Sequence, residues 1–112
     1  MEATTTSIVP GSGVYTLINV FTVAPERQAE LVRLLEEATE EVMRHLPGFI
    51  SANIHRGVEG TRVANYAQWE SREHFEAMLR NPLAQTHMRA AAALVEKFEP
   101  HFYEVVSTHA RA

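Results

Sequence analysis

Residues 63–71 read Val-Ala-Asn-Tyr-Ala-Gln-Trp-Glu-Ser. Successive side chains of a β-strand point to opposite faces, so every second residue of this stretch shares one face: Val63, Asn65, Ala67 and Trp69. An Asn beside the only Trp of the chain is unusual for a core, because a buried amide needs partners for its donors and its acceptor. Either Trp69 fills the core beside a satisfied Asn65, or the two residues form a polar site in an apolar pocket.

Composition narrows the possible functions. The chain has 112 residues, 46% of them hydrophobic, and a net charge of −4, which indicates one domain that would gain from burying surface in a partner. Lys97 is the only lysine and no basic patch occurs, so nucleic-acid binding is not expected. The absence of Cys excludes disulfides, thiol nucleophiles and iron–sulfur clusters. No apolar run has membrane-spanning length and the first residues do not form a signal peptide, so we expect a cytoplasmic protein without a membrane partner.

The N-terminal part predicts a tail followed by a strand. Residues 1–13 are small and polar and end in Pro-Gly-Ser-Gly, which is typical of a flexible tail, and they precede a single domain at 14–112. Residues 14–23 are rich in β-branched and aromatic side chains and predict a strand. Asn19 interrupts its apolar centre and shares a face with Leu17 and Phe21. Without further information, Asn19 is either a site residue or a structural residue at a bulge or loop.

A helix and a second strand follow. Pro25 suits a first helical position, and apolar residues at helical spacing predict an amphipathic helix that ends before Pro47. Residues 49–56 alternate again between apolar and polar side chains and predict a strand, with Ile50, Ala52 and Ile54 on one face. Residues 57–60 predict a hairpin turn. If Gly57 pairs with Gly60, the strand opposite is 63–69, and these three side chains lie on the face of Asn65 and Trp69. His55 then lies on the other face, although a turn one residue longer or shorter would reverse this placement.

The last third predicts two helices and a final strand at 98–107. Ser71 is suited to cap the first helix, which buries Phe75, Met78 and Leu79, and Asn81-Pro82 ends it and begins the second. His87 lies on the apolar stripe of the second helix, together with Met88 and several alanines. It is either a satisfied core residue or a functional group of a pocket.

The order strand, helix, strand, strand, helix pair, strand predicts an α+β fold of the ferredoxin-like split β-α-β type with an antiparallel four-stranded sheet. In this arrangement the first and third strands are central neighbours, which brings Asn19 close to Asn65 and Trp69. Helices cover one face of such a sheet, so the face that carries Tyr66 and Gln68 needs other cover.

Three segments together resemble the antibiotic biosynthesis monooxygenase family: the Asn65–Ser71 run, the preceding Pro-Gly-Phe-Ile-Ser-Ala at 47–52, and a first strand that carries Asn19. The similarity is greatest to the small cofactor-independent oxygenases of aromatic polyketide pathways and extends from about residue 14 to about residue 106. The resemblance implies a homodimer of the dimeric α/β-barrel type, in which the uncovered sheet face packs against a second subunit.

The expected reaction is inferred from the motifs that the sequence lacks and from the family resemblance. The sequence has no metal-ligand pattern, no nucleotide-binding loop and no Gly-Xaa-Ser-Xaa-Gly elbow, so no metal or cofactor is expected. The resemblance implies that O2 oxidises a polycyclic aromatic polyketide, of anthrone or phenol type, to a quinone. It further implies that Asn65 and Trp69 are the main hydrogen-bond donors, with Asn19 as a third.

The remaining site residues are expected as follows. His87 or Arg89 would be an accessory acid or charge partner; Arg89 lies off the apolar stripe and is included only because the resemblance places an Arg of this helix in the pocket. The substrate-binding wall is expected to comprise Phe21, Ile50, Ala52, Ile54, Phe75, Met78 and Met88. The resemblance also indicates that Phe75 replaces a Tyr of some members, which removes a phenol donor.

Two other classes of function remain open. A haem-binding or haem-degrading relative would also use an Asn of the first strand, a Trp and a His on the following helix. The Asn65–Trp69 run argues against this alternative, and His74, the His of that helix, lies only five residues after the Trp. A polyketide cyclase or a non-catalytic ligand-binding dimer could share the same fold.

Overall fold

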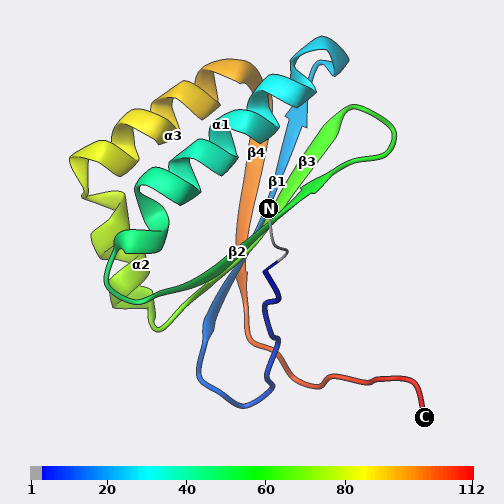
Figure 1. The fold of residues 1–112 in the computed structure, drawn as a ribbon, viewed down its shortest axis with the longest axis vertical. Coiled ribbons are helices and arrows are strands. Elements are labelled where there is room, and N and C mark those ends of the chain that lie inside the picture. The colour runs from blue at the N-terminus through cyan, green and yellow to red at the C-terminus, as the bar shows by residue number, and fades with distance from the viewer. Residues whose placement is uncertain (1–3) are drawn as a thin grey trace.

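The computed structural model describes residues 4–112 and contains four strands, three α-helices and two short 3-10 helices (Figure 1). In chain order the elements are β1 (Tyr15–Val23), η1 (Pro25–Arg27), α1 (Gln28–Glu41), η2 (Met43–His45), β2 (Phe49–Arg56), β3 (Arg62–Trp69), α2 (Arg72–Leu79), α3 (Pro82–Leu94) and β4 (Val95–Tyr103).

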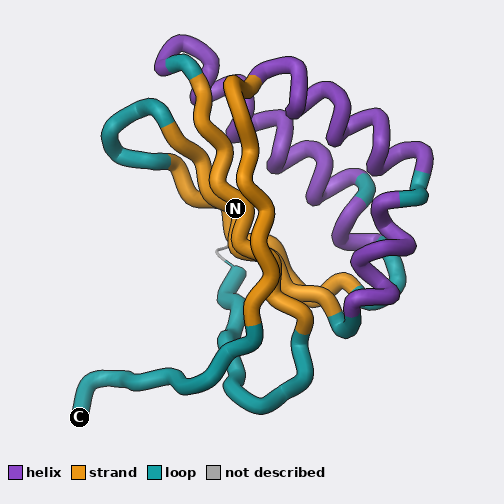
Figure 2. Tube along the Cα trace, turned by 180° about the vertical axis from the view of Figure 1, so that it is seen from behind, coloured by secondary structure: helices purple, strands orange, loops and turns teal. Residues whose placement is uncertain are grey.

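The strands form one antiparallel sheet in the order β2-β3-β1-β4. Figure 2 shows the sheet and the helices as two layers, with all three α-helices on one side. The predicted ferredoxin-like α+β fold is therefore confirmed, with β1 and β3 as central neighbours. None of the described helices is both long and apolar enough to cross a bilayer.

Two clusters of buried side chains hold the helices on the sheet. One surrounds Trp69 and includes Leu17, Val42, Ala67, Phe75, Met78 and Ala84. The other lies toward the opposite end of the central strands and consists of Phe21, Val23, Leu31, Val63 and Ala91. Since both clusters lie between the same two layers, the space between them is bounded by β1, β3 and the helices.

The predicted starts of α2 and α3 are confirmed by their caps, whereas Pro25 begins the short η1 and α1 itself begins at Gln28. The Ser71 side chain accepts a hydrogen bond from the backbone N–H of His74 at 3.2 Å, and Asn81 accepts from Leu83 and Ala84 at 2.9 and 3.1 Å. These bonds satisfy backbone donors that the first turn of a helix leaves free. Pro82 occupies the first turn of α3, where its missing N–H costs no hydrogen bond.

The last strand begins and ends earlier than expected, at Val95–Tyr103 instead of 98–107. The helix passes directly into the strand, because Val95 already has an extended backbone (φ −104°, ψ 155°) and pairs with Val23. Pro100 is compatible with β4 because this strand is at the edge of the sheet, where one row of backbone groups is free of ladder bonds.

The β2–β3 hairpin differs from the expected register by two residues. The N–H of Gly57 bonds to the carbonyl of Arg62 at 2.8 Å, so the loop is longer than a Gly57–Gly60 turn, and Ile54 lies opposite Asn65. Because the shift is an even number, the side chains of residues 52–56 stay on their expected faces. His55 is on the face away from the helices, as predicted, but lies opposite Ala64.

A β-bulge at the start of β2 changes one prediction. The register shifts between Phe49 and Ser51, so Phe49 pairs with Trp69, and Ile50 between them has no opposite residue. Ile50 is 44% exposed. The extra residue of a bulge reverses the alternation locally, which replaces Ile50 by Phe49 on the helix-covered face.

The sheet face away from the helices is called the open face and is defined here by Thr16, Ile18 and Val20 of β1 and Ala64, Tyr66 and Gln68 of β3. Residues 4–13, part of the expected tail at 1–13, form no helix or strand, and the Thr6 hydroxyl bonds to the Asn53 side-chain oxygen at 2.6 Å. The first three residues of that tail lie outside the described residues. Its flexibility stays a prediction.

Gly48 and Gly60 provide a matched test of the turn geometry. Both have positive φ, at 82° and 91°, but a Cβ on Gly48 would overlap the Cβ and Cγ of His74, whereas one on Gly60 meets open space. We expect Gly60→Ala to lower the free energy of unfolding by about 1–2 kcal/mol through backbone strain alone. Gly48→Ala should cost clearly more, because His74 must also move. Urea denaturation of both variants checks this, and equal losses would contradict it.

Candidate active site

Asn19 of β1 and Asn65 of β3 are direct partners in the antiparallel register. Side chains of directly opposite residues have Cβ atoms about 5 Å apart on the same sheet face. Both amides point to the helix-covered face. Their side-chain oxygens are fully buried, and neither has a hydrogen-bond partner within residues 4–112. Buried amide oxygens are normally satisfied, so this pair is the feature of the fold that calls for a ligand.

The two amides border a cavity of about 250 Å³ between the sheet and the helices. Its wall is mostly aliphatic, aromatic or thioether: Leu17, Phe21, Leu34, Leu35, Ala38, Met43, Phe49, Ala52, Ala67, Trp69, Phe75, Met78, Leu79, Met88, Ala91, Ala92, Phe98 and Pro100. Asn19, Asn65, Thr39 and His87 add polar groups. The Thr39 hydroxyl already donates to the Leu35 carbonyl at 2.8 Å, which leaves the amides, the imidazole and the indole N–H of Trp69 as the groups available to a ligand.

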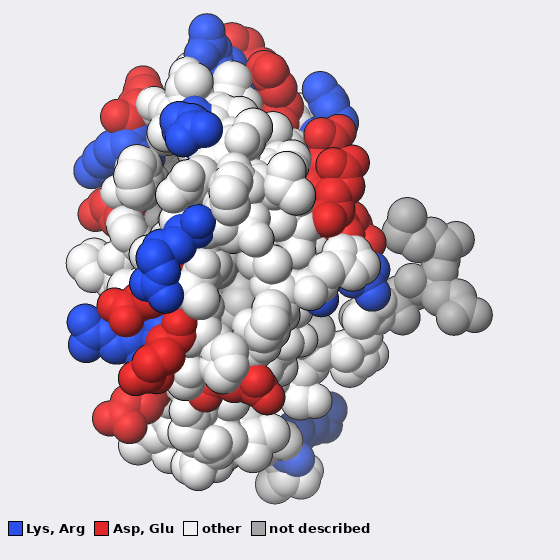
Figure 3. Space-filling view, turned by 90° about the vertical axis from the view of Figure 1, so that its left-hand side faces the viewer, with Lys and Arg blue, Asp and Glu red and all other residues white. Residues whose placement is uncertain are grey.

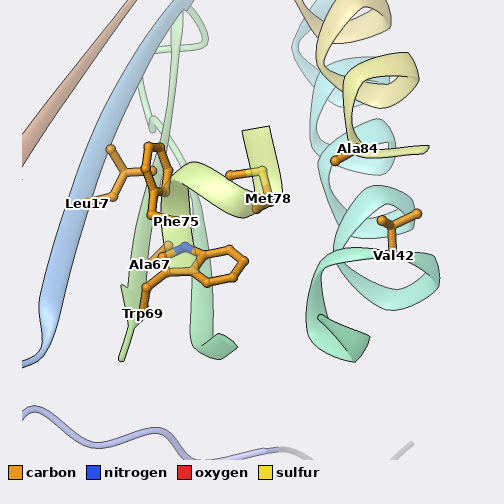
Figure 4. Packing of buried hydrophobic residues seen from close by; sticks show 7 residues of the cluster. All are labelled: Leu17, Val42, Ala67, Trp69, Phe75, Met78 and Ala84. Atoms are coloured by element: carbon orange, nitrogen blue, oxygen red, sulfur yellow. The ribbon is translucent and has the colours of Figure 1, made fainter. Parts of the chain in front are cut away.

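Trp69 forms one end of the cavity and is only 2% exposed. Its indole meets Phe49 edge to face at a centroid distance of 5.4 Å and Phe75 at 6.2 Å. Figure 4 shows the indole between the sheet and the helices, with its nitrogen on the ring edge turned toward Phe75. These edge-to-face contacts fix the ring plane. The direction of the indole N–H is therefore set by packing.

The cavity reaches solvent where exposed residues of α2, α3 and β4 line it. The lining residues Leu79 and Phe98 are 39% and 52% exposed, and Ala92 and Pro100 are exposed as well. Figure 3 views the molecule from the side of α2 and α3 and shows an uncharged band between margins of basic and acidic side chains. An apolar molecule therefore meets few charges on this route to the amides.

His87 is the only titratable side chain in the cavity wall that the structure describes. The carboxyl of Glu73, whose pKa is lowered by hydrogen bonds from its own backbone and from the Ser71 hydroxyl, lies at the exposed start of α2, outside the cavity. Residues 4–112 contain no cluster of three or more His, Asp or Glu side chains arranged to hold a metal ion.

Most of the residues predicted from the sequence meet at this cavity. Nine of them line it: Asn19, Phe21, Ala52, Asn65, Trp69, Phe75, Met78, His87 and Met88. Their placement agrees with the prediction, while their individual roles stay proposals.

Three predicted residues lie elsewhere. Arg89 is exposed and is not part of the wall, since two residues along a helix from His87 place it on the opposite side. Ile50 is turned outward by the β-bulge. Ile54 is on the expected face but packs against the cluster of Leu31 and Val63, beyond the cavity.

Sequence reasoning missed several wall residues. Phe49 was missed because the bulge that exposes Ile50 has no signal in the alternation pattern. Phe98 and Pro100 belong to the predicted last strand, but they face the cavity because β4 pairs with β1 in a register that sets them opposite Phe21 and Asn19, and the pattern of one strand does not give this register. Leu17 had a usable signal, because it shares the β1 face of Asn19.

His74, the histidine on which the haem-binding alternative depends, lies outside the cavity wall. Its ring nitrogen contacts the Ser71 hydroxyl at 2.7 Å, and its other nitrogen is 4.0 Å from a Glu70 carboxylate oxygen. These contacts give His74 a structural role in the first turn of α2.

The fold and the cavity define an α+β protein that encloses a largely apolar small molecule against a few hydrogen-bonding groups. More specifically, the chain belongs to the antibiotic biosynthesis monooxygenase family, whose model matches residues 14–93. It is 44% identical over 99 residues to the tetracenomycin-F1 monooxygenase of Streptomyces glaucescens, covering 88% of each chain. The predictions of this family and of a monooxygenase are confirmed.

Solved structures support the same placement. A monooxygenase from the ActVA-Orf6 gene of Streptomyces coelicolor, in complex with nanaomycin D, superimposes with a TM-score of 0.81 at 27% identity, covering 90% of this chain and 95% of that one. SnoaB of Streptomyces nogalater, described as a cofactor-independent oxygenase, gives 0.74 at 26% identity over 86% and 96%.

The bulge can be tested by comparing two neighbouring substitutions. Phe49→Ala removes a half-buried ring that contacts Trp69, and we expect it to lower the free energy of unfolding by about 2–4 kcal/mol. Ile50→Ala removes a side chain that is 44% exposed and should cost about 1 kcal/mol or less. Chemical denaturation of both variants measures the difference. A larger loss of stability for Ile50→Ala than for Phe49→Ala would contradict the bulge and would favour the regular alternation that the sequence predicts.

Proposed function

We propose that this protein uses O2, without a cofactor, to oxidise a polycyclic phenol or anthrone of an aromatic polyketide pathway to a quinone. The observation that carries the proposal is the Asn19–Asn65 pair, with two buried and unpartnered amide oxygens in an otherwise apolar cavity. The relatives give independent support, because one is named a tetracenomycin-F1 monooxygenase and another is described as a cofactor-independent oxygenase.

The cavity suits a flat aromatic molecule with oxygen atoms on one edge. Aliphatic and aromatic walls bind the rings, and a few polar groups orient them. A substrate hydroxyl would donate to an Asn oxygen, while the amide N–H of the same or the neighbouring Asn would donate to a carbonyl or phenolate oxygen. Two adjacent amides can therefore hold a hydroxyl and a ketone that lie side by side on the rings.

The reaction needs no redox group from the protein, because the substrate anion is itself the reductant. At an anthrone CH2, loss of one proton leaves an electron pair on carbon. This pair reduces O2 and forms a carbon–oxygen bond, which gives a peroxide. Cleavage of the O–O bond with loss of the second hydrogen gives the ketone and water, so that CH2 and O2 become C=O and H2O.

The role of the protein in this scheme is to stabilise the anion and the peroxide. Donors held in place before charge develops are the effective ones, and losing one costs about 3–4 kcal/mol in other enzymes. We assign this role to the amides of Asn65 and Asn19 and to the indole N–H of Trp69, whose ring is fixed by Phe49 and Phe75.

We further propose that the protein acts as a homodimer through its open face. The α-helices cover only the other face, and Ile18, Val20 and Tyr66 are half-buried residues of the open face without a helix above them. The buried Thr16 hydroxyl, on the same face, has no hydrogen-bond partner among the described residues. Packing against a second copy would remove this apolar surface from water.

Trp69→Phe and Asn65→Ala test the donor roles. We expect each to lower kcat by about tenfold to a hundredfold, because a donated bond strengthens as charge develops and the other donors remain. KM should change much less. The assay is O2 consumption with an anthrone such as dithranol, normalised to folded protein.

Asn53→Ala is the matched control, because its amide bonds to the Tyr66 carbonyl at 3.0 Å on the face away from the cavity. Its kcat should remain within about twofold of wild type. If Trp69→Phe lowers the melting temperature but keeps full turnover per folded protein, Trp69 is a core residue without a catalytic role.

Light scattering tests the homodimer. We expect a mass near twice that of the 12.6 kDa chain, and Ala64→Glu should shift the protein toward monomer because it places a charge on a central strand of the open face, where the proposed interface would bury it. Val58→Glu, at a hairpin position that is fully exposed, should leave the mass unchanged. A wild-type monomer at assay concentration would contradict the proposed interface.

A further inference from the structure

We propose that His87 is the general base that removes the proton from the bound substrate, an inference that rests on the proposed function. His87 is half-buried on α3 and belongs to the cavity wall. His87 belongs to the side of the cavity that the helices form, whereas Asn19 and Asn65 belong to the side that the sheet forms. A flat substrate between the two layers would therefore have amides on one side and the imidazole on the other.

No other group in the described wall can accept a proton near neutral pH. The wall residues from α1 are Leu34, Leu35, Ala38 and Thr39, those from α2 are Phe75, Met78 and Leu79, and those from β4 are Phe98 and Pro100. The strands β1, β2 and β3 contribute apolar residues, the two amides and Trp69. Amides, indoles and hydroxyls do not act as bases at this pH, whereas histidine exchanges protons there.

The charged groups of the surrounding elements point elsewhere. Every Glu and Arg of α1 is exposed, and so are Lys97, Glu99 and Arg89. On α2, the half-buried Glu76 is 3.4 Å from Arg72, and His74 is held by Ser71 and Glu70. Tyr66 lies on the open face, on the other side of the sheet. None of these groups lines the cavity, so His87 would be the proton acceptor that a bound substrate meets.

His87 also differs from the structural histidines of the chain. The rings of His45, His55 and His74 each have a hydrogen-bond partner among the described residues, and His87 has none there. The exposed His101 has none either, but it lies outside the cavity wall. A core histidine is normally satisfied by a neighbour. The free ring nitrogens of His87 are therefore available to a ligand.

The proton balance closes within one turnover. A ring nitrogen of His87 takes a proton from the substrate C–H or O–H, and the electron pair of that bond stays on the substrate as a carbanion or phenolate. This anion reduces O2 and becomes a peroxide anion bonded to carbon. The imidazolium returns its proton to the outer peroxide oxygen, and loss of water then gives the carbonyl. His87 ends the cycle neutral, as it began.

His87→Gln tests the proposal, because glutamine keeps hydrogen-bonding groups of similar reach but cannot take up the proton. With dithranol at neutral pH we expect kcat to fall by about a hundredfold, within the usual range for loss of a general base, while KM changes little. The rate should recover as pH rises to where dithranol ionises by itself. In His87→Ala, added imidazole should restore part of the activity.

His45→Gln is the control, since His45 is exposed on η2 and contacts the Glu40 carbonyl outside the cavity. It should keep the wild-type rate, pH profile and insensitivity to imidazole. Wild-type turnover and pH profile in His87→Gln would overturn the proposal, and so would a loss that neither alkaline pH nor imidazole relieves in folded protein. Absence of O2 uptake by the wild type with anthrones would instead count against the proposed function itself.

Discussion

The antiparallel pairing of β1 with β3 is the constraint on which the site depends. Its register sets Asn19 directly opposite Asn65 and turns both amides toward the helices. A slip of one residue would move every side chain of one strand to the other face and would separate the pair. The register is held from both ends, because Phe21 and Val63 are buried in one cluster and Leu17 and Ala67 in the other. The apolar core thus positions the polar site.

The same arrangement leaves unsatisfied polar atoms in an otherwise apolar core. A buried polar atom without a partner costs about 1–3 kcal/mol, and two amide oxygens are in this state. Apolar residues of similar shape would remove this cost, so the amides are best explained by a ligand that satisfies them. The aromatic contacts around Trp69 have a related effect, because they hold an indole in one orientation beside the space that a ligand would fill.

The two faces of the sheet differ in what covers them. The helix-covered face encloses the cavity, and the exposed part of the cavity wall is apolar, with Leu79 of α2 and Phe98 of β4 among its side chains. The open face has buried polar residues, with the Ser51 hydroxyl donating to the Gln68 side-chain oxygen at 2.6 Å, beside half-buried apolar ones. Chemistry and self-association can therefore use separate surfaces, so that changes in one need not disturb the other.

The sequence by itself determined the order of the elements, their periodicity and the face of each strand residue. Asn19, Asn65 and Trp69 could be assigned to one surface because alternation and the strand order of this fold are sufficient for that step. His87 could be placed on the apolar stripe of its helix because residues three and four apart share one face of a helix. Local pattern was also enough for the caps at Ser71 and Asn81.

Only the tertiary structure decided where the alternation breaks and how far each element extends into the cavity. The bulge that exchanges Ile50 for Phe49 and the longer hairpin loop depend on how β2 pairs with β3, a non-local contact that leaves no mark in the pattern of one strand. Helical periodicity already separates His87 from Arg89, but only the packing of α3 on the sheet decides that the stripe of His87 borders a cavity. Ile54 lies on the predicted face but outside the cavity. Alternation along the strand determines which face a side chain occupies, whereas the packing of the helices on the sheet determines which part of that face borders the cavity.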